Sequence, residues 1–538
     1  MHCHFTSPRW QASELPGGHG HLCGIAWRGA ARLGPADLGE LVDPAVDPGR
    51  WRARLADLNG FHALVRHDAS ALVAAVDRIR SIPLYYGVAD GRLYLSDDAD
   101  WVRRQVGEET MSEAACTDFA LAGYVTGRDT LYRRVKQLLA GEALVARDTD
   151  TGLSISLERY YRFSHAEVPG RGDAERQAAL GEVTEAAFRR LVEVADGRQI
   201  VVPLSGGHDS RLVATMLARL DYPRVLTYAY GHRGNREAEV SREVAARLGL
   251  AWTFVEYSET AWQAVAATRA YWDYQQWASG WHSIANMQDW LAVKRLTERG
   301  EVESGALFVP GHCCVTGFVP PALFAAERES RTLAAGELAE ALRDRHFVLR
   351  QGEGSQACFH DQVLPRLAGS YPLDEALSAD AFLQAFVLFG WQERQAKFIV
   401  NTVRSFEYFG HDWWMPLYDR EFMAFWQHVP LRWLDGRQAY VAFVDREFAA
   451  VSGIDTPLGN AAQQSRRSLR ARLTRLAAFR RGPGARVKRA VKRLVPGLAR
   501  GNTLASGGRF PPETLERLRA RGYSHNGVAA QLFLERFS

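Results

Sequence analysis

The chain has 538 residues, of which 47% are hydrophobic and 24% are charged, a composition typical of a globular protein with two or three domains. No apolar run approaches the roughly 18 residues that a membrane-spanning helix needs, and six cysteines in so long a chain do not indicate a disulfide framework. The first residues lack a charged segment followed by an apolar one, so we expect no secretory signal and a cytoplasmic protein.

The N-terminal end of the chain is rich in histidine and glycine. Imidazole and thiolate groups suit zinc, and this region supplies several of them: His2, Cys3, His4, His19, His21 and Cys23. Their spacing matches no closed four-ligand pattern, and three glycines between positions 17 and 20 favour a flexible backbone. We therefore expect residues 1–21 to form a flexible leader.

Residues 58–68 alternate apolar and polar side chains, as a half-buried strand does, and residues 77–87 end in a tight turn.

A strand, a glycine turn and a helix follow one another from residue 199. The apolar run at 200–204 predicts a buried strand, Ser-Gly-Gly at 205–207 ends it, and apolar residues recur at helical spacing beyond. Such a turn directs backbone N–H groups and the positive end of the helix at an anion. No Gly-Lys-Ser/Thr follows, so this is not the lysine-bearing nucleotide loop.

Strand and helix patterns continue to alternate after this turn. Residues 224–230 predict a second strand that Gly231 ends, residues 236–248 a helix, and residues 252–255 a third strand. This alternation predicts a parallel sheet with helices on both faces. Ligands bind at the carboxyl ends of such strands, where residues 205–210 would meet Tyr230 and Gly231.

Charge is concentrated near the C-terminus. Residues 465–500 contain thirteen Lys or Arg and no Asp or Glu, with apolar residues at helical spacing on either side of Pro483-Gly484. Two basic amphipathic helices are the plain interpretation. They could contact an acidic membrane surface, an RNA or a partner protein, but we favour an apolar stripe packed on the core with solvated arginines outside.

Two separated motifs carry a resemblance to a known family. Ser205-Gly-Gly-His-Asp209-Ser210 resembles the pyrophosphate loop of ATP pyrophosphatases. Residues 396–407, followed by Met-Pro-Leu-Tyr-Asp at 415–419, resemble the asparagine synthetase motif in which a small-residue helix leads to Pro-Phe-Leu-Asp. Residues 178–460 therefore look like an asparagine synthetase ATP-binding domain.

The N-terminal part resembles the second half of a class II glutamine amidotransferase domain. Gly60-Phe61-His-Ala resembles that family's Gly-x-Phe-Ala, and Arg80-Ser-Ile-Pro-Leu-Tyr-Tyr its Arg-x-Pro-Leu-Tyr-Tyr. The implied fold is α/β, with a doubly wound parallel sheet of ATP pyrophosphatase type (adenine nucleotide alpha hydrolase-like). It follows an N-terminal α+β domain that resembles a truncated amidotransferase over residues 22–165. Residues 461–538 remain as a basic helical segment.

The resemblance implies an ATP-dependent ligase. A carboxylate would attack the α-phosphorus of ATP to give an acyl-adenylate and pyrophosphate, and an amine would then displace AMP. Asp209 would hold Mg²⁺. The stretch that matches the loop carrying a second magnesium acid, residues 307–317, contains no carboxylate. The other implied contacts are Leu204, Ser205, Gly206, Gly207, Ser210, Tyr230 and Gly231 around ATP and pyrophosphate, Glu407 at the amine, and Lys397 and Arg404 as charge-stabilising groups.

Glutamine is not the expected nitrogen source. Cys23-Gly-Ile matches the family's opening nucleophile, but 22 residues precede Cys23, so its nitrogen is an amide and cannot act as a base. The family's Arg-Gly-Pro and Asn-Gly-Glu segments, which hold glutamine, do not occur between Cys23 and Leu58. Ammonia or an amine is expected instead.

The substrate class stays open at this level. It would be a small-molecule or peptide carboxylate, and an intramolecular cyclase of lasso-peptide or β-lactam type is an alternative. A non-catalytic nucleotide-binding scaffold is another alternative, because of the missing acid. A homodimer is possible, and no nucleic-acid partner is expected.

Overall fold

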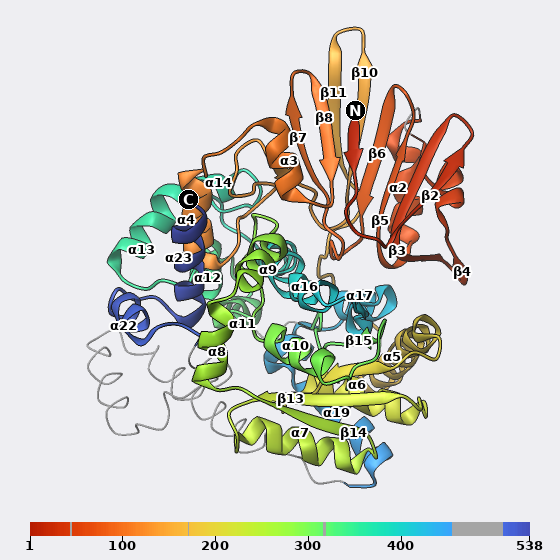
Figure 1. The fold of residues 1–538 in the computed structure, drawn as a ribbon, viewed down its shortest axis with the longest axis vertical. Helices are drawn as coiled ribbons and strands as arrows, with labels where there is room; N and C mark the ends of the chain where they lie inside the picture. Colours follow the sequence, from red (N-terminus) through yellow and green to blue (C-terminus); the bar gives the residue numbers. More distant parts are fainter. Residues whose placement is uncertain (44–45, 171, 316–318, 455–508) are drawn as a thin grey trace.

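The computed structural model describes residues 1–43, 46–170, 172–315, 319–454 and 509–538. Figure 1 shows a β-rich part at the top, a parallel sheet flanked by helices at the bottom, and helices between them. No helix among these described residues is long and apolar enough to span a membrane.

The β-rich part is a sandwich of two sheets (Figure 1). The larger sheet is antiparallel in the order β11-β10-β6-β5-β3-β2, and β4 pairs with β3. The smaller one has the order β1-β8-β7-β9. The strands are β1 (His2–His4), β2 (Trp10–Leu15), β3 (Gly18–Arg28), β4 (Ala31–Arg32), β5 (Asn59–His67), β6 (Ala71–Val76), β7 (Tyr85–Ala89), β8 (Arg92–Ser96), β9 (Lys136–Gln137), β10 (Glu142–Thr149) and β11 (Gly152–Arg159).

Each face of the larger sheet buries its own set of apolar side chains. Phe61, Ala63 and Val65 of β5 point into the core shared with Leu93 and Leu95 of the smaller sheet. The opposite face packs on α1 (Leu38–Leu41) and α2 (Pro48–Asp57), where buried side chains include Leu22, Leu41, Trp51, Leu55 and Leu64. The alternation over residues 58–68 therefore predicts β5 correctly, although both of its faces are covered.

The expected flexible leader is wrong. Residues 1–21 form β1, β2 and the first part of β3. β2 pairs along β3 in antiparallel register from Trp10 opposite Cys23 to Leu15 opposite Gly18, and β1 adds a parallel strand to β8. Backbone pairing outweighs the local flexibility of the three glycines, since two of them lie in strands and only Gly17 occupies the turn, at φ 77°.

The lower part contains the predicted parallel sheet, in the order β14-β13-β12-β15-β16 (Figure 1). From β12 the chain moves outward through β13 to β14 and then returns to the other side of β12, which is a doubly wound topology. The elements are α5 (Asp173–Ala195), β12 (Ile200–Pro203), α6 (His208–Arg219), β13 (Val225–Gly231), α7 (Arg236–Arg247), β14 (Ala251–Glu256), α10 (Trp290–Glu298), β15 (Leu307–Phe308) and β16 (Asp412–Trp413).

Helices lie between the two parts (Figure 1). A continuous helical run contains α15 (Ala379–Phe389), the π-helical η3 (Gly390–Ile399), η4 (Val400–Val403) and α16 (Arg404–Tyr408). The remaining helices include α3 (Ala99–Val106), α4 (Glu113–Ala122), α8 (Glu259–Ala266), α9 (Arg269–Ser279), α11 (Pro321–Glu329), α12 (Glu337–His346), α13 (Glu353–Cys358), α14 (Leu364–Ala368), α17 (Arg420–Gln427), α18 (Leu431–Leu434) and α19 (Gln438–Ser452).

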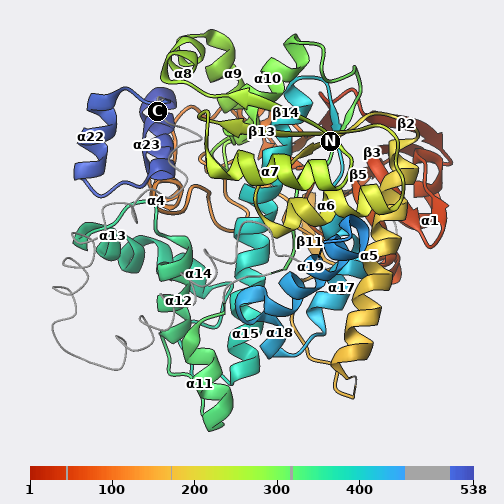
Figure 2. The ribbon, with the colours of Figure 1, turned by 90° about the horizontal axis from the view of Figure 1, so that it is seen from below.

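The C-terminal helices pack on the body of the protein. α22 (Pro512–Ala520) and α23 (His525–Phe537) lie beside α4 in Figure 2, and the Phe533 ring of α23 lies 5.3 Å from the Phe119 ring of α4. The basic stretch at 465–500, for which we expect two amphipathic helices, lies outside the described residues.

Candidate functional site

The Ser-Gly-Gly turn lies where the sequence predicts it, between β12 and α6. Its two serines hold the turn together. The Ser205 backbone N–H donates to Ser210 Oγ at 3.1 Å, the two hydroxyl oxygens are 3.1 Å apart, and the Gly207 N–H donates to Ser205 Oγ at 3.2 Å. The preceding Leu204 is buried and its N–H donates to Tyr228 O of β13 at 2.8 Å. The sheet thus fixes the turn at the start of α6, whose first turn lines a pocket.

This nucleotide-type pocket has a volume of about 340 Å³, within the range of small-ligand sites. Ser205, Gly207, Asp209 and Ser210 form one wall. Other lining residues include Tyr230 near the end of β13, residues 284–289 before α10, Pro310 to His312 after β15, and Phe398, Ile399 and Thr402 of η3 and η4.

Asp209 is ion-paired in this structure. The Arg437 guanidinium, which directly precedes α19, donates to both carboxylate oxygens, one of them at 3.2 Å. Burial alone would lower the pKa of Arg437, but the Asp209 carboxylate raises it above its usual value. The Arg437 guanidinium therefore places a permanent positive charge beside the loop, as a phosphate site requires.

The residues after β15 complete the wall opposite the loop. Gly311 lies so close to the loop that a Cβ atom there would stand 2.5 Å from Ser210 N, so only glycine fits. His312 Nε2 lies 2.5 Å from Thr402 Oγ1 of η4, and burial lowers the pKa of His312 to about 4. Its imidazole is consequently neutral at pH 7. Residues 307–315 contain no carboxylate, as the sequence shows.

Tyr230 lines the pocket, whereas its neighbour Gly231 does not. The Tyr230 ring stacks on Tyr257 at 4.9 Å, and Gly231 has φ 134°, a conformation reserved for glycine. Next to them lies a carboxyl group that the motifs do not indicate. Asp289 lines the pocket and accepts from Asn286 Nδ2 at 3.0 Å. Burial raises the pKa of the Asp289 carboxyl, and hydrogen bonds from Asn286 and Tyr230 oppose that rise.

The three residues expected at the chemical step do not line this pocket. Glu407 and Arg404 line a second pocket of about 310 Å³ between the sandwich and the helical run. There Glu407 accepts from the Arg9 guanidinium, from Arg404 at 2.5 Å and from the Trp413 indole at 2.7 Å. The nucleotide-type pocket is lined by Phe398, Ile399 and Thr402 of the same helical run. The second pocket is lined by Asn401 and Arg404, so this helical run separates the two pockets.

Lys397 is fully buried in the helical run. Its ammonium donates to Glu393 at 2.5 Å and to the backbone oxygens of Val125 and Gly127 at 2.9 and 2.5 Å. Burial lowers the pKa of Lys397, and Glu393 opposes that shift. These hydrogen bonds connect η3 to the loop after α4. Lys397 therefore has a structural position and does not lie at the nucleotide-type pocket.

Cys23 lies in the middle of β3. It is fully buried, with Trp10 of β2 on one side and Ala63 of β5 on the other. Burial raises the pKa of the Cys23 thiol to about 12, so at pH 7 it is protonated.

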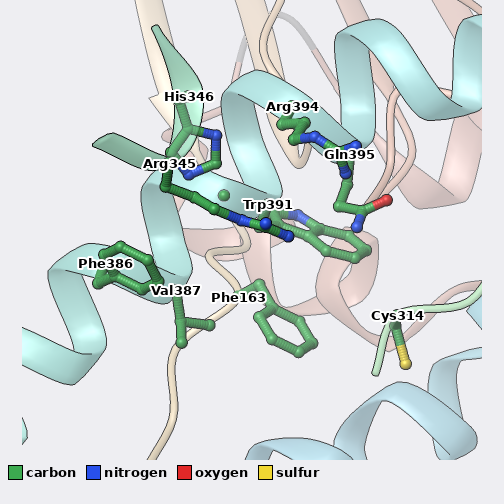
Figure 3. Close-up of a pocket in the computed structure, with 10 residues that line it drawn as sticks. Phe163, Cys314, Arg345, His346, Phe386, Val387, Trp391, Arg394 and Gln395 are labelled. Carbon is green, nitrogen blue, oxygen red and sulfur yellow. The ribbon is translucent and has the colours of Figure 1, made fainter. Parts of the chain in front are cut away.

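A third and smaller pocket lies on another side of η3 (Figure 3). Phe163 and Trp391, whose rings stack at 4.7 Å, form part of it together with Arg345, Arg394 and the Cys314 side chain. Its volume of about 50 Å³ suits a water molecule or two rather than a substrate. Cys314 is buried there.

Some residues in the pocket or beside it give little signal in the sequence. Arg437 and Asp289 each directly precede a helix, a position where polar residues are common for local reasons. Arg509, His525 and Asn526 also line the nucleotide-type pocket, although they lie far along the chain from the motifs. The Arg509 guanidinium donates to the Tyr271 hydroxyl at 3.0 Å.

The parallel sheet and its loop define an α/β fold of ATP-pyrophosphatase type joined to an N-terminal domain. A family model for asparagine synthase matches residues 179–435, and one for a glutamine amidotransferase domain matches residues 46–161. Together the two matches place the chain in an asparagine synthetase-like family, whose members use ATP to form C–N bonds. Among curated proteins, none matches the sequence significantly.

Similar solved structures share little sequence with this chain. Ammonia-dependent NAD synthetase from Campylobacter jejuni is 12% identical, with 36% of this chain and 97% of that chain covered and a TM-score of 0.21. Glutamine phosphoribosylpyrophosphate amidotransferase from B. subtilis is 10% identical, with 58% and 65% covered and a TM-score of 0.19. The U34-tRNA thiolase NcsA from Methanococcus maripaludis is 13% identical, with 46% and 87% covered and a TM-score of 0.20.

Proposed function

We propose that this protein activates a carboxylate with ATP, releases pyrophosphate, and transfers the resulting acyl-adenylate to ammonia or an amine with loss of AMP. The observation that carries the proposal is the Ser205–Ser210 loop, held between β12 and α6 on the wall of a 340 Å³ pocket. N–H donors at a helix start, two hydroxyls and a guanidinium are the groups that phosphoryl chemistry requires.

Ser205, Gly206, Gly207 and Ser210 would bind the pyrophosphate portion of ATP. Arg437 would move from the Asp209 carboxylate toward the phosphates when ATP enters, because both are anionic partners for one guanidinium. The donor set fits magnesium carried in on ATP, since Mg²⁺ is usually bound through one or two carboxylates and substrate phosphates. Asp209 would be its protein ligand, and the ion would reduce the charge repulsion between the phosphates.

Asp289 is the group that we assign to the attacking amine. Its carboxyl lines the same pocket as the loop, and its raised pKa makes it a better proton acceptor than an ordinary aspartate. Glu407 already accepts from two guanidinium groups in the second pocket, and Lys397 is used in buried contacts. We therefore assign no chemical step to Glu407, Lys397 or Arg404.

Asp289→Asn should separate the two half-reactions. We expect exchange of labelled pyrophosphate into ATP to persist, because adenylation does not need this carboxyl. Amide formation should fall about 100-fold or more, the scale of a lost general base. Asp273→Asn, an exposed carboxylate on α9 that pairs with Arg269, is the matched control and should change neither rate. Equal loss of both half-reactions would remove Asp289 from the amine step.

Cys23→Ala should leave amide formation intact, and glutamine should not be converted to glutamate. The thiol is buried and protonated, and the Cys23 nitrogen lies in the β-ladder between β2 and β5. Glutamate release and amide yield with glutamine or ammonium check this directly. A mature protein that begins at Cys23 and releases glutamate would contradict it.

The overall proposal is tested by measuring pyrophosphate and AMP with ATP, magnesium and a panel of amino acids, uronic acids and short peptides, with hydroxylamine as the amine. Release of both products with at least one carboxylate supports an adenylating ligase. ATP binding without turnover across the panel would favour the nucleotide-binding scaffold. Cyclisation of a peptide without added amine would identify an intramolecular cyclase.

A further inference from the structure

Three histidines lie on one face of neighbouring strands in the N-terminal sheet. His19 and His21 are two positions apart on β3, so their side chains point to the same side. His67 of β5 is the register partner of His19. The three histidines lie near the start of β3. They are on the same face of the sheet as Cys23, which is buried in the core further along β3. It is outside all the pockets described above.

The imidazole nitrogens of His21 and His67 already converge. Their Nε2 atoms are 3.2 Å apart, and their ring centroids are 5.3 Å apart. Two imidazoles bound to one tetrahedral zinc ion at 2.0–2.1 Å would hold their nitrogens about 3.3 Å apart. The pair therefore has the separation that a shared ion requires.

His19 is positioned to add a third ligand. Its ring centroid lies 5.4 Å from that of His67, close to the 5.3 Å between His67 and His21. As the side chains stand, no group of three or more His, Cys, Asp or Glu residues in the described part of the chain is placed to hold a metal ion. His19 is exposed, however, so its side chain can change rotamer toward the pair.

The pair is sheltered on one side. His21 and His67 are both half-buried. The Phe5 ring lies 5.2 Å from His21 and shields one side.

The remaining histidines of the N-terminal end have other partners. His2 stacks on Tyr94 and His4 on Trp101, both beside the smaller sheet. We propose that His19, His21 and His67 bind one divalent transition-metal ion of the zinc type, with a fourth position open to water. Two of these histidines are separated by two positions on one strand, and the third lies on the neighbouring strand. The rigid pairing of the two strands would therefore set the geometry of the metal ligands.

Cobalt is the probe, because Co²⁺ reports tetrahedral nitrogen coordination through visible absorption while occupying zinc sites. Full-length protein stripped with EDTA should bind one equivalent of Co²⁺ and develop that absorption, and Zn²⁺ should displace it. Zn²⁺ should also raise the melting temperature of the wild type. His67→Ala and, separately, His21→Gln should weaken binding about 100-fold or more, since loss of even an outer partner costs 10–100-fold.

His360→Ala, at an exposed histidine that follows α13, is the control and should bind like the wild type. His19→Ala should retain weak binding with altered absorption. Circular dichroism in EDTA shows whether each variant is folded before metal is added. Absence of the visible band in the folded wild type, or its persistence in both His67→Ala and His21→Gln, would leave only a hydrogen bond between two imidazoles and overturn the proposal.

Discussion

Asp209→Asn is expected to reduce pyrophosphate release by about 100-fold or more while the protein stays folded. The substitution removes the negative charge that orients Arg437 beside the loop and would hold the magnesium of ATP. Asparagine has nearly the same shape, and the Asp209 side chain is 27% exposed, so the structural cost should be small. Pyrophosphate release under saturating ATP and a thermal melt check the two halves of the prediction.

Asp344→Asn is the matched control for this loss of charge. Asp344 also pairs with an arginine, Arg343, but its side chain is 71% exposed on α12 and lies outside the nucleotide-type pocket. Its turnover should equal that of the wild type. Normal pyrophosphate release by Asp209→Asn would show that the loop does not bind the reacting phosphates, and the proposed function would then lose its main support.

The parallel sheet and the loop that forms one wall of the nucleotide-type pocket can be predicted from the sequence, because the residues that determine them are close together in the chain. Residues 200–213 contain a buried strand, a glycine turn and a helix start within fifteen positions, and each leaves its own periodicity. Backbone geometry then dictates that the loop meets Tyr230 at the strand ends. Gly311 is a less obvious case, because only the structure shows the approach to Ser210 that requires glycine.

The leader and Glu407 could not be predicted in the same way. Strand β2 exists because β3 offers it a partner edge, and no property of residues 10–15 alone reveals that edge. Glu407 lies on a helix that carries a family-like motif, but which face of the run meets which pocket depends on the π-helical and 3₁₀ turns of η3 and η4. Those turns change the rotation per residue, so ideal helical spacing misplaces everything beyond them.

The second large effect concerns stability rather than catalysis. Glu407→Gln should destabilise the protein by about 2–4 kcal/mol, slightly below the roughly 3–5 kcal/mol typical of breaking a fully buried ion pair. The Glu407 side chain is only 10% exposed, and its loss of charge leaves the Arg9 and Arg404 guanidinium groups facing each other. Because Arg9 lies in the turn before β2 and Arg404 in the helical run, the effect falls on the contact between the two parts.

Chemical denaturation of the variant, followed through tryptophan fluorescence, measures this loss. Glu421→Gln is the control: Glu421 also pairs with an arginine, Arg190, but is 40% exposed, so the cost should be below about 1 kcal/mol. Adding Arg9→Gln to Glu407→Gln should recover part of the lost stability, because it removes one of the two uncompensated charges. Unchanged stability together with a selective loss of amide formation would instead return Glu407 to the chemical step.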